Sequence, residues 1–160
     1  MIRFLLAALL LGGGMLPAVA ASWSGHVTHV TDGDTLWVQP AQGGAARKIR
    51  LEGVDAPEIC QTYGDTARAA LAAHVQGRSV QVVGRRNDDY GRLLAHVHVQ
   101  GEDVGAWLVA HGHAWSYGRN QHDAGPYAAQ QEAARTQRRG LWQARAVSPR
   151  TFRRRHGPCH

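Results

Sequence analysis

The sequence predicts a small α+β domain, and three observations support this class. Short β-prone runs separated by turn residues come first, and runs with helical periodicity are interleaved later. The chain has 160 residues, of which 44% are hydrophobic. This length and composition are typical of a single globular domain with a real core. We expect residues 21–145 to form that domain, with residues 146–160 as a basic tail.

Five stretches have the alternation expected of short strands. Asp32-Gly33 separates the first two of them, and Asp-Gly between β-prone runs is a strong hairpin signal. Gln42-Gly43-Gly44 supplies the next turn. The predicted strands are residues 24–31, 35–39, 47–53, 79–84 and 93–99.

Three stretches have helical spacing and end at glycine. In the first, Ala67, Leu71 and Val75 recur at intervals of four residues, and Gly77 suits the left-handed conformation that ends many helices. The predicted helices are residues 63–76, 102–110 and 126–139. The order of the strands in the sheet does not follow from this pattern.

Residues 1–20 are expected to be an export signal. Arg3 gives a positive start, residues 4–11 are apolar, and Ala18-Val19-Ala20 is a small-residue cleavage site. A membrane anchor is the alternative, but the apolar run is shorter than the roughly 20 residues that a spanning helix needs. We therefore expect cleavage after Ala20 and a periplasmic or secreted protein.

The chain is basic, with 18 Lys and Arg against 12 Asp and Glu and a formal charge of +6. A basic exported domain suits a polyanionic partner. On charge alone, a soluble domain with an incidentally basic surface remains the alternative.

Carboxylates and arginines gather in three short motifs. Residues 50–58 contain Arg50, Asp55 and Glu58 and pass through an Ala-Pro step that favours extended backbone over helix. Residues 32–35 read Asp-Gly-Asp-Thr, and residues 88–92 read Asp-Asp-Tyr-Gly-Arg. Carboxylates bind hard cations, and arginines form paired hydrogen bonds to phosphate. Together they indicate metal-assisted chemistry on a phosphate ester.

These three motifs, in this order and spacing, resemble the staphylococcal nuclease (thermonuclease-like) family, over residues 25–142. The resemblance implies a five-stranded OB-type barrel with three helices. It also implies a calcium-dependent nuclease that cuts DNA and RNA with little sequence preference and leaves 3′-phosphate ends. A non-catalytic OB-fold that only binds nucleic acid is the main alternative, and an exported structural domain is another.

The resemblance assigns Asp34, Asp55 and the backbone carbonyl of Ala56 as ligands of a calcium ion. From the residues alone, Asp34 could equally be a turn-capping aspartate. An EF-hand is excluded because no glutamate closes the twelve-residue loop that this motif requires.

Arg50 and Arg92 are the candidate phosphate-binding residues, because fixed cations stabilise the charge that develops on a phosphoryl transition state. Lone arginines are otherwise mostly surface ion-pair partners. Glu58 is the candidate for orienting or deprotonating the attacking water. Polarisation by the metal could do much of the same work, so its role as a general base stays open.

Tyr90, Trp115 and Tyr117 are candidates for stacking on bases, since aromatic faces bind any base without reading sequence. We instead expect a place in the core for Trp107, Leu108 and Trp142, since burial in the core is the usual role of a large apolar side chain.

Cys60 and Cys159 are the only cysteines. In an exported protein an even number of cysteines usually means pairing. We expect a disulfide within a monomer that straps the tail across the domain and anchors the loop after Glu58, so that reduction lowers both stability and activity. Free thiols and a disulfide-linked dimer are the alternatives.

Overall fold

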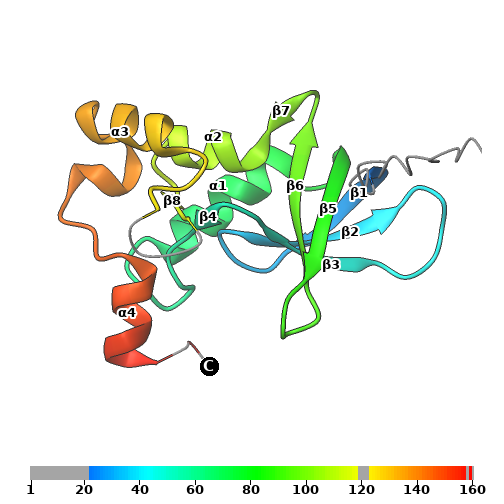
Figure 1. Ribbon diagram of the computed structural model, residues 1–160, viewed down its shortest axis with the longest axis horizontal. Coiled ribbons are helices and arrows are strands. Elements are labelled where there is room, and N and C mark those ends of the chain that lie inside the picture. Colours follow the sequence, from blue (N-terminus) through cyan, green and yellow to red (C-terminus); the bar gives the residue numbers. More distant parts are fainter. Residues whose placement is uncertain (1–21, 119–122, 158, 160) are drawn as a thin grey trace, which may run out of the picture.

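The computed structural model describes residues 22–118, 123–157 and 159 (Figure 1). Its centre is a closed five-stranded barrel. The strands are β1 (Ser22–Val30), β2 (Thr35–Pro40), β3 (Arg47–Leu51), β5 (Ser79–Asn87) and β6 (Leu93–Val99). They lie in the order β3-β2-β1-β5-β6, and a parallel pairing of β3 with β6 closes the barrel.

The helices and short strands lie at the ends and sides of this barrel. The helices are α1 (Gly64–Val75), α2 (Val104–Ala110), α3 (Ala128–Thr136), the 3-10 helix η1 (Gly140–Gln143) and α4 (Pro149–His156). The two-residue strands are β4 (Val54–Asp55), β7 (Glu102–Asp103) and β8 (Trp115–Ser116), of which β4 pairs with β8. Figure 1 shows α2 and α3 together on one side and α4 set apart from them.

The core is formed by the inward-facing side chains of the strands. Leu36, Val38 and Ile49 are fully buried, and the buried residues of α1 and α2 complete the same cluster. The alternation of β6, buried at every second residue, follows from one strand face turning inward. The result is a rigid support for the loops at one end of β2 and β3.

The predicted α+β class and OB-type barrel are confirmed. All five predicted strands and all three predicted helices are present, with bounds shifted by a few residues. The third strand ends at Leu51 rather than Gly53, because residues 52–53 form a turn in which Gly53 has a φ of 81°. Left-handed backbone of this kind is much easier for glycine than for other residues.

The fourth helix, α4, was not predicted, although the sequence holds its start signal. The Ser148 hydroxyl oxygen accepts a hydrogen bond from the Thr151 N–H, and Pro149 occupies the first helical turn. Serine at the N-cap followed by proline is a recognised helix start. The predicted tail is therefore ordered as a short basic helix.

The expected export signal lies outside the described residues, so it stays a prediction. Within residues 22–118, 123–157 and 159, the helices are too short and too polar for one of them to span a bilayer.

Candidate active site

Two buried aspartates meet where β2 begins and β4 ends. Asp34 is 7% exposed and Asp55 is 3% exposed. A carboxylate oxygen of Asp34, Oδ2, accepts a hydrogen bond from the Ala56 N–H at 2.9 Å, which ties the two loops together. Gly33 permits this approach, because a Cβ there would lie 2.6 Å from the Ala56 Cβ. The close contact also explains why a small residue suits position 56.

Arg50 joins the two aspartates. Its guanidinium lies 3.0 Å from the Asp34 carboxylate and 3.4 Å from that of Asp55. It also donates hydrogen bonds to the backbone carbonyls of Leu51 and Val54. These four contacts hold one side chain, of which 16% is exposed, in a single orientation. Arg50 is thus a preorganised cation on a central strand.

Burial disfavours the charged form of the aspartates in the two loops that carry Asp34 and Asp55. Burial raises the pKa of Asp55, Asp34 raises it further, and Arg153 and Arg50 oppose the shift. Burial, followed by the charge of Asp34, raises the pKa of Asp32 to about 6. A cation at this site would therefore be stabilised by the surrounding carboxylates.

Glu58 lies on a tight turn between β4 and α1. Its N–H donates to the side chain of Gln61 at 3.2 Å, and its carbonyl accepts from the Gln61 N–H at 2.8 Å. A Cβ on Gly64 would overlap the Glu58 carbonyl oxygen, so the start of α1 fixes the position of this turn. The Glu58 carboxylate accepts a hydrogen bond of 2.6 Å from Arg153.

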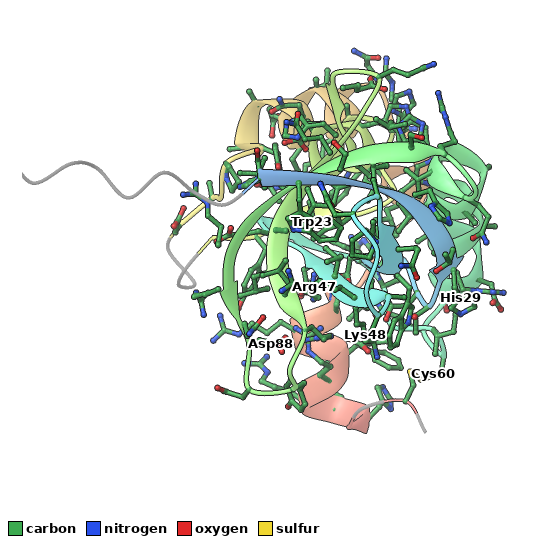
Figure 2. All side chains as sticks on the ribbon, turned by 90° about the vertical axis from the view of Figure 1, so that its right-hand side faces the viewer. Trp23, His29, Arg47, Lys48, Cys60 and Asp88 are labelled. Atoms are coloured by element: carbon green, nitrogen blue, oxygen red, sulfur yellow. A yellow bond between two sulfur atoms is a disulfide. The ribbon has the colours of Figure 1, made fainter. Side chains whose placement is uncertain are left out.

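Arg92 is placed by the hairpin between β5 and β6. Its Nε–H donates to Asp88 at 2.7 Å, and the Asp88 carboxylate also accepts from the Arg92 and Tyr90 backbone N–H groups. Burial raises the pKa of Asp88, but these hydrogen bonds outweigh it and leave the pKa below its ordinary value. Asp88 therefore acts as an anionic anchor for Arg92. Figure 2 shows Asp88 on this hairpin.

A cleft of about 600 Å³ connects the two predicted phosphate-binding residues, because Arg50 and Arg92 both line it. Arg85 and Arg86, on β5, line the same cleft. Neither was identified from the sequence, although two adjacent arginines beside the Asp88 hairpin were a usable signal. Four arginines thus face one cavity.

The structure separates the three candidate stacking residues. Tyr117 lines the cleft and is 44% exposed. Tyr90 is 85% exposed on the hairpin, with the Arg92 guanidinium 5.3 Å from the centre of its ring. Trp115 is 8% exposed and packs edge-on against Trp142, with ring centres 5.4 Å apart. Trp115 lines a second cavity of about 380 Å³ rather than the arginine cleft.

Cys60 and Cys159 form a disulfide, with Cα atoms 5.7 Å apart. The predicted pairing is confirmed. Figure 2 shows Cys60 beside the chain that follows α4. The bond joins the turn after Glu58 to the end of the tail.

A further residue that sequence reasoning missed is Arg153, on α4. Its guanidinium forms two parallel hydrogen bonds of 3.1 Å to the Asp55 carboxylate and a third contact with Glu58. No local pattern signals this contact, since Arg153 lies 98 residues from Asp55.

The donor set fits a hard cation. Two carboxylates and nearby backbone carbonyls supply oxygen, which calcium and magnesium prefer over nitrogen or sulfur. In the part of the chain that the structure describes, no group of three or more His, Cys, Asp or Glu side chains could hold a metal. An ion here would therefore need backbone and water oxygens beside Asp34 and Asp55.

Buried carboxylates beside an arginine-lined cleft, on the end of an OB-type barrel, define a hydrolase of phosphate esters. Comparison with known proteins narrows this class. The sequence profile described as Staphylococcal nuclease homologue matches residues 48–144. The chain therefore belongs to the staphylococcal nuclease family, and it is a phosphodiesterase that acts on nucleic acid.

Individual relatives agree with this assignment. An uncharacterized endonuclease of Escherichia coli O157:H7 is 37% identical over 142 residues, which cover 87% of this chain and 90% of the relative. A micrococcal nuclease of Shigella flexneri is 35% identical over 133 residues, covering 76% and 75%. A further uncharacterized endonuclease, from Haemophilus influenzae, is 33% identical over 130 residues, covering 81% and 72%.

Proposed function

We propose that the protein is an exported, calcium-dependent nuclease that hydrolyses DNA and RNA with little sequence preference and leaves 3′-phosphate ends. The observation that carries the proposal is the joining of Asp34 and Asp55 by Arg50, at one edge of a cleft lined by three further arginines. Arg50 thus contacts both aspartates that would hold a metal, and it also lines the cationic cleft that would hold phosphate.

The ion would be held by Asp34, Asp55 and the backbone carbonyl of Ala56, with water completing its shell. When bound, calcium supplies a Lewis acid that polarises the phosphoryl oxygen and the attacking water. With so few protein ligands, its dissociation constant is expected near the 10⁻⁴–10⁻³ M of extracellular calcium modules.

Arg50 and Arg92 would bind the scissile phosphate from two sides of the cleft. Negative charge grows on the phosphoryl oxygens as the water attacks, so fixed guanidinium groups stabilise the transition state more than the ground state. Arg50 is fixed by Asp34, Asp55 and two carbonyls, and Arg92 is fixed by Asp88. Both guanidinium groups are therefore positioned at the cleft before the charge develops.

Glu58 would orient the attacking water and accept its proton. As the water oxygen bonds to phosphorus, Glu58 would take one of the water's protons and the bond between phosphorus and the 5′ oxygen would break. The 5′ oxygen would take up a proton from solvent as it leaves, and Glu58 would later return its proton to solvent. A carboxylate can serve in this way only when its oxygens are free to reach the water. In the structure the Glu58 carboxylate is engaged by Arg153.

The low sequence preference follows from how the cleft would hold the polymer. Arginines contact phosphates, which are the same in every nucleotide, and Tyr117 and Tyr90 offer aromatic faces that stack on any base. The buried position of Trp115 leaves it outside this role. Export is supported by the disulfide, because such bonds persist in oxidising compartments.

The test is cleavage of plasmid DNA and of a structureless RNA by the purified protein, with millimolar calcium or with excess chelator. We expect cutting of both polymers with calcium, none with chelator, and recovery when calcium is restored. End-labelling should find 3′-phosphates. Equal cutting under chelation contradicts the metal dependence, and binding without cutting under every metal contradicts the catalytic proposal.

A further inference from the structure

The tail contact of Arg153 occupies the carboxylates that the reaction needs. One guanidinium nitrogen, Nη1, lies 3.1 Å from Asp55 Oδ1 and 2.6 Å from Glu58 Oε1, and the other, Nη2, lies 3.1 Å from Asp55 Oδ2. Both oxygens of the proposed calcium ligand and one oxygen of the proposed base are therefore engaged by one side chain.

Apart from the Arg153 contacts, helix α4 has few attachments to the rest of the protein, and two of them lie beyond its ends. Pro149 is its only buried residue among 149–156, and the helix makes few contacts with the other described helices and strands. Just before it, the Val147 carbonyl accepts a hydrogen bond of 2.6 Å from Gln61. Beyond it, Cys159 is bonded to Cys60. Because the helix buries so little apolar surface, the Arg153 hydrogen bonds are the main interactions that must break when it moves.

We propose that α4 is an autoinhibitory segment: Arg153 competes with the calcium ion for Asp55, and the Cys60–Cys159 disulfide keeps it close enough to compete. This inference rests on the proposed function, because it concerns regulation of the same site. On this proposal, Asp55 binds either the calcium ion or Arg153, but not both at once.

The exclusion is geometric and electrostatic. Calcium binds carboxylate oxygen at 2.3–2.6 Å, and a guanidinium that already bonds both oxygens of Asp55 covers that approach. A divalent ion placed beside Arg153 would also meet a like charge in a partly buried site, where screening by water is weaker than in bulk solvent. Arg50 contacts only one oxygen of Asp55, at 3.4 Å, so the barrel arginine alone leaves the other oxygen accessible.

The competition is intramolecular because Arg153 and Asp55 belong to one chain, and the disulfide raises the effective concentration of Arg153 by fixing the second end of the tail. A short tether holds a ligand at millimolar effective concentration, whereas a tail released at one end samples far more positions. Opening the disulfide would therefore favour the metal. This reverses the expected effect of reduction on activity: stability should still fall, but cleavage at limiting calcium should rise.

The direct test is the calcium dissociation constant, measured by titration calorimetry on the complete oxidised protein without nucleic acid. We expect Arg153→Gln to bind calcium about 10- to 100-fold more tightly than the wild type. This is the change expected if the wild-type form with Arg153 on Asp55 is about 10 to 100 times more populated than the open form that binds calcium. Arg154→Gln is the matched control. It removes the same charge from the next residue of the helix, whose side chain is exposed, and it should change the constant less than threefold.

The double variant Cys60→Ser/Cys159→Ser is the second arm, because it frees the tail without changing any charge. Circular dichroism and thermal melting would verify that it is folded. We expect tighter calcium binding than in the wild type, and a smaller additional effect when Arg153→Gln is combined with it. Such non-additivity is the mark of two changes that act on one contact.

The outcomes separate the two proposals. Tighter binding in Arg153→Gln and in the cysteine variant, with Arg154→Gln unchanged, supports autoinhibition. Equal constants in the wild type and Arg153→Gln, or weaker binding in Arg153→Gln, overturn it while leaving the calcium site in place. If Arg153→Gln tightens binding but the charge-neutral cysteine variant does not, the effect is one of charge and the tethered competitor is refuted. If no variant binds calcium at all, the proposed function itself fails.

Discussion

Two arginines reach the same aspartate from regions of very different construction. Arg50 lies on β3, inside the barrel sheet, and four contacts leave 16% of its side chain exposed. Arg153 lies on α4, outside the barrel, and 36% of its side chain is exposed. Its three hydrogen bonds to Asp55 and Glu58 are shorter than the single 3.4 Å hydrogen bond of Arg50 to Asp55.

The comparison teaches that the number and quality of ion-pair contacts do not decide whether a cation is a fixed part of a site. What decides it is the free energy of unfolding of the element that carries the side chain. Arg50 is held by contacts with Asp34 and two barrel carbonyls as well as Asp55, whereas Arg153 can leave when a poorly buried helix shifts. The barrel arginine is therefore suited to catalysis and the tail arginine to control.

Replacing the barrel arginine should cause a large loss of rate. Arg50→Lys should lower kcat about 10²–10³-fold at saturating calcium, roughly 3–4 kcal/mol, since lysine loses the planar fork that grips two phosphate oxygens. Single-turnover cleavage of a labelled oligonucleotide measures this, with circular dichroism to verify the fold.

The matched change in the tail is Arg153→Lys. At saturating calcium its kcat should stay within about threefold of the wild type, because a displaced tail takes no part in the chemical step. A loss comparable to that of Arg50→Lys would place Arg153 in the reaction itself.

Glu58 belongs to both regions, since the barrel loop carries it and the tail arginine binds it. Glu58→Gln should lower kcat about 10²–10⁴-fold, the usual contribution of general acid–base catalysis. Because calcium is held mainly by Asp34 and Asp55, its dissociation constant should change far less than the rate. A variant that keeps wild-type kcat would remove Glu58 from the mechanism and leave the metal to activate the water.

Sequence was a good guide to the barrel region for a physical reason. Alternation, the Asp-Gly turn and the Ala-Pro step are local determinants, and they predicted the bounds of β2 and the end of β3 to within one or two residues. The short motifs then placed Asp34 and Asp55 on loops that a barrel necessarily brings together. Arg50 and Arg92 followed as residues of the same strands and hairpin that line the cleft.

The tail region was predicted less well because its contacts are not local. The Ser148-Pro149 start of α4 was visible in the sequence, but the partner of Arg153 depends on a disulfide that spans 99 residues. Trp115 shows the opposite difficulty. Tyr117, two positions further along the chain, lines the cleft. Trp115 is instead buried against Trp142, and no local pattern in the sequence reveals this packing.

The disulfide should contribute to stability, because it closes a long loop and the entropy removed from the unfolded chain grows with the logarithm of the loop length. For a separation of 99 residues, the chain-entropy estimate approaches about 4.7 kcal/mol, and measured contributions are typically about 2–4 kcal/mol. Cys60→Ser/Cys159→Ser should lower the free energy of unfolding by about that amount in urea titrations. If the barrel unfolds with an unchanged free energy while only α4 is lost, the strap stabilises the tail alone.

The smallest effects come from a matched pair of helix caps, one in each region. The Asp103 carboxylate accepts from the Ala106 N–H at 2.9 Å and from the Tyr127 hydroxyl, and it caps α2 against the core. Ser148 caps α4 in the same way. Removing such a cap usually costs about 0.5–2 kcal/mol.

The two caps should differ in what they destabilise. Asp103→Ala should lower the global melting temperature, while Ser148→Ala should leave it nearly unchanged and speed amide hydrogen exchange within α4 alone.

Burial raises the pKa of Asp103, but hydrogen bonds from His96, Ala106 and Tyr127 outweigh it and leave the pKa below its ordinary value of 3.8. The stabilisation by Asp103 is therefore fully present above that pH and is lost as the pH falls towards the folded-state pKa. Calorimetric melting between pH 7 and pH 3 should show the difference between wild type and Asp103→Ala shrinking at the acid end. A global loss of stability in Ser148→Ala would instead show that α4 unfolds with the barrel, and the distinction between a fixed and a movable arginine would fail with it.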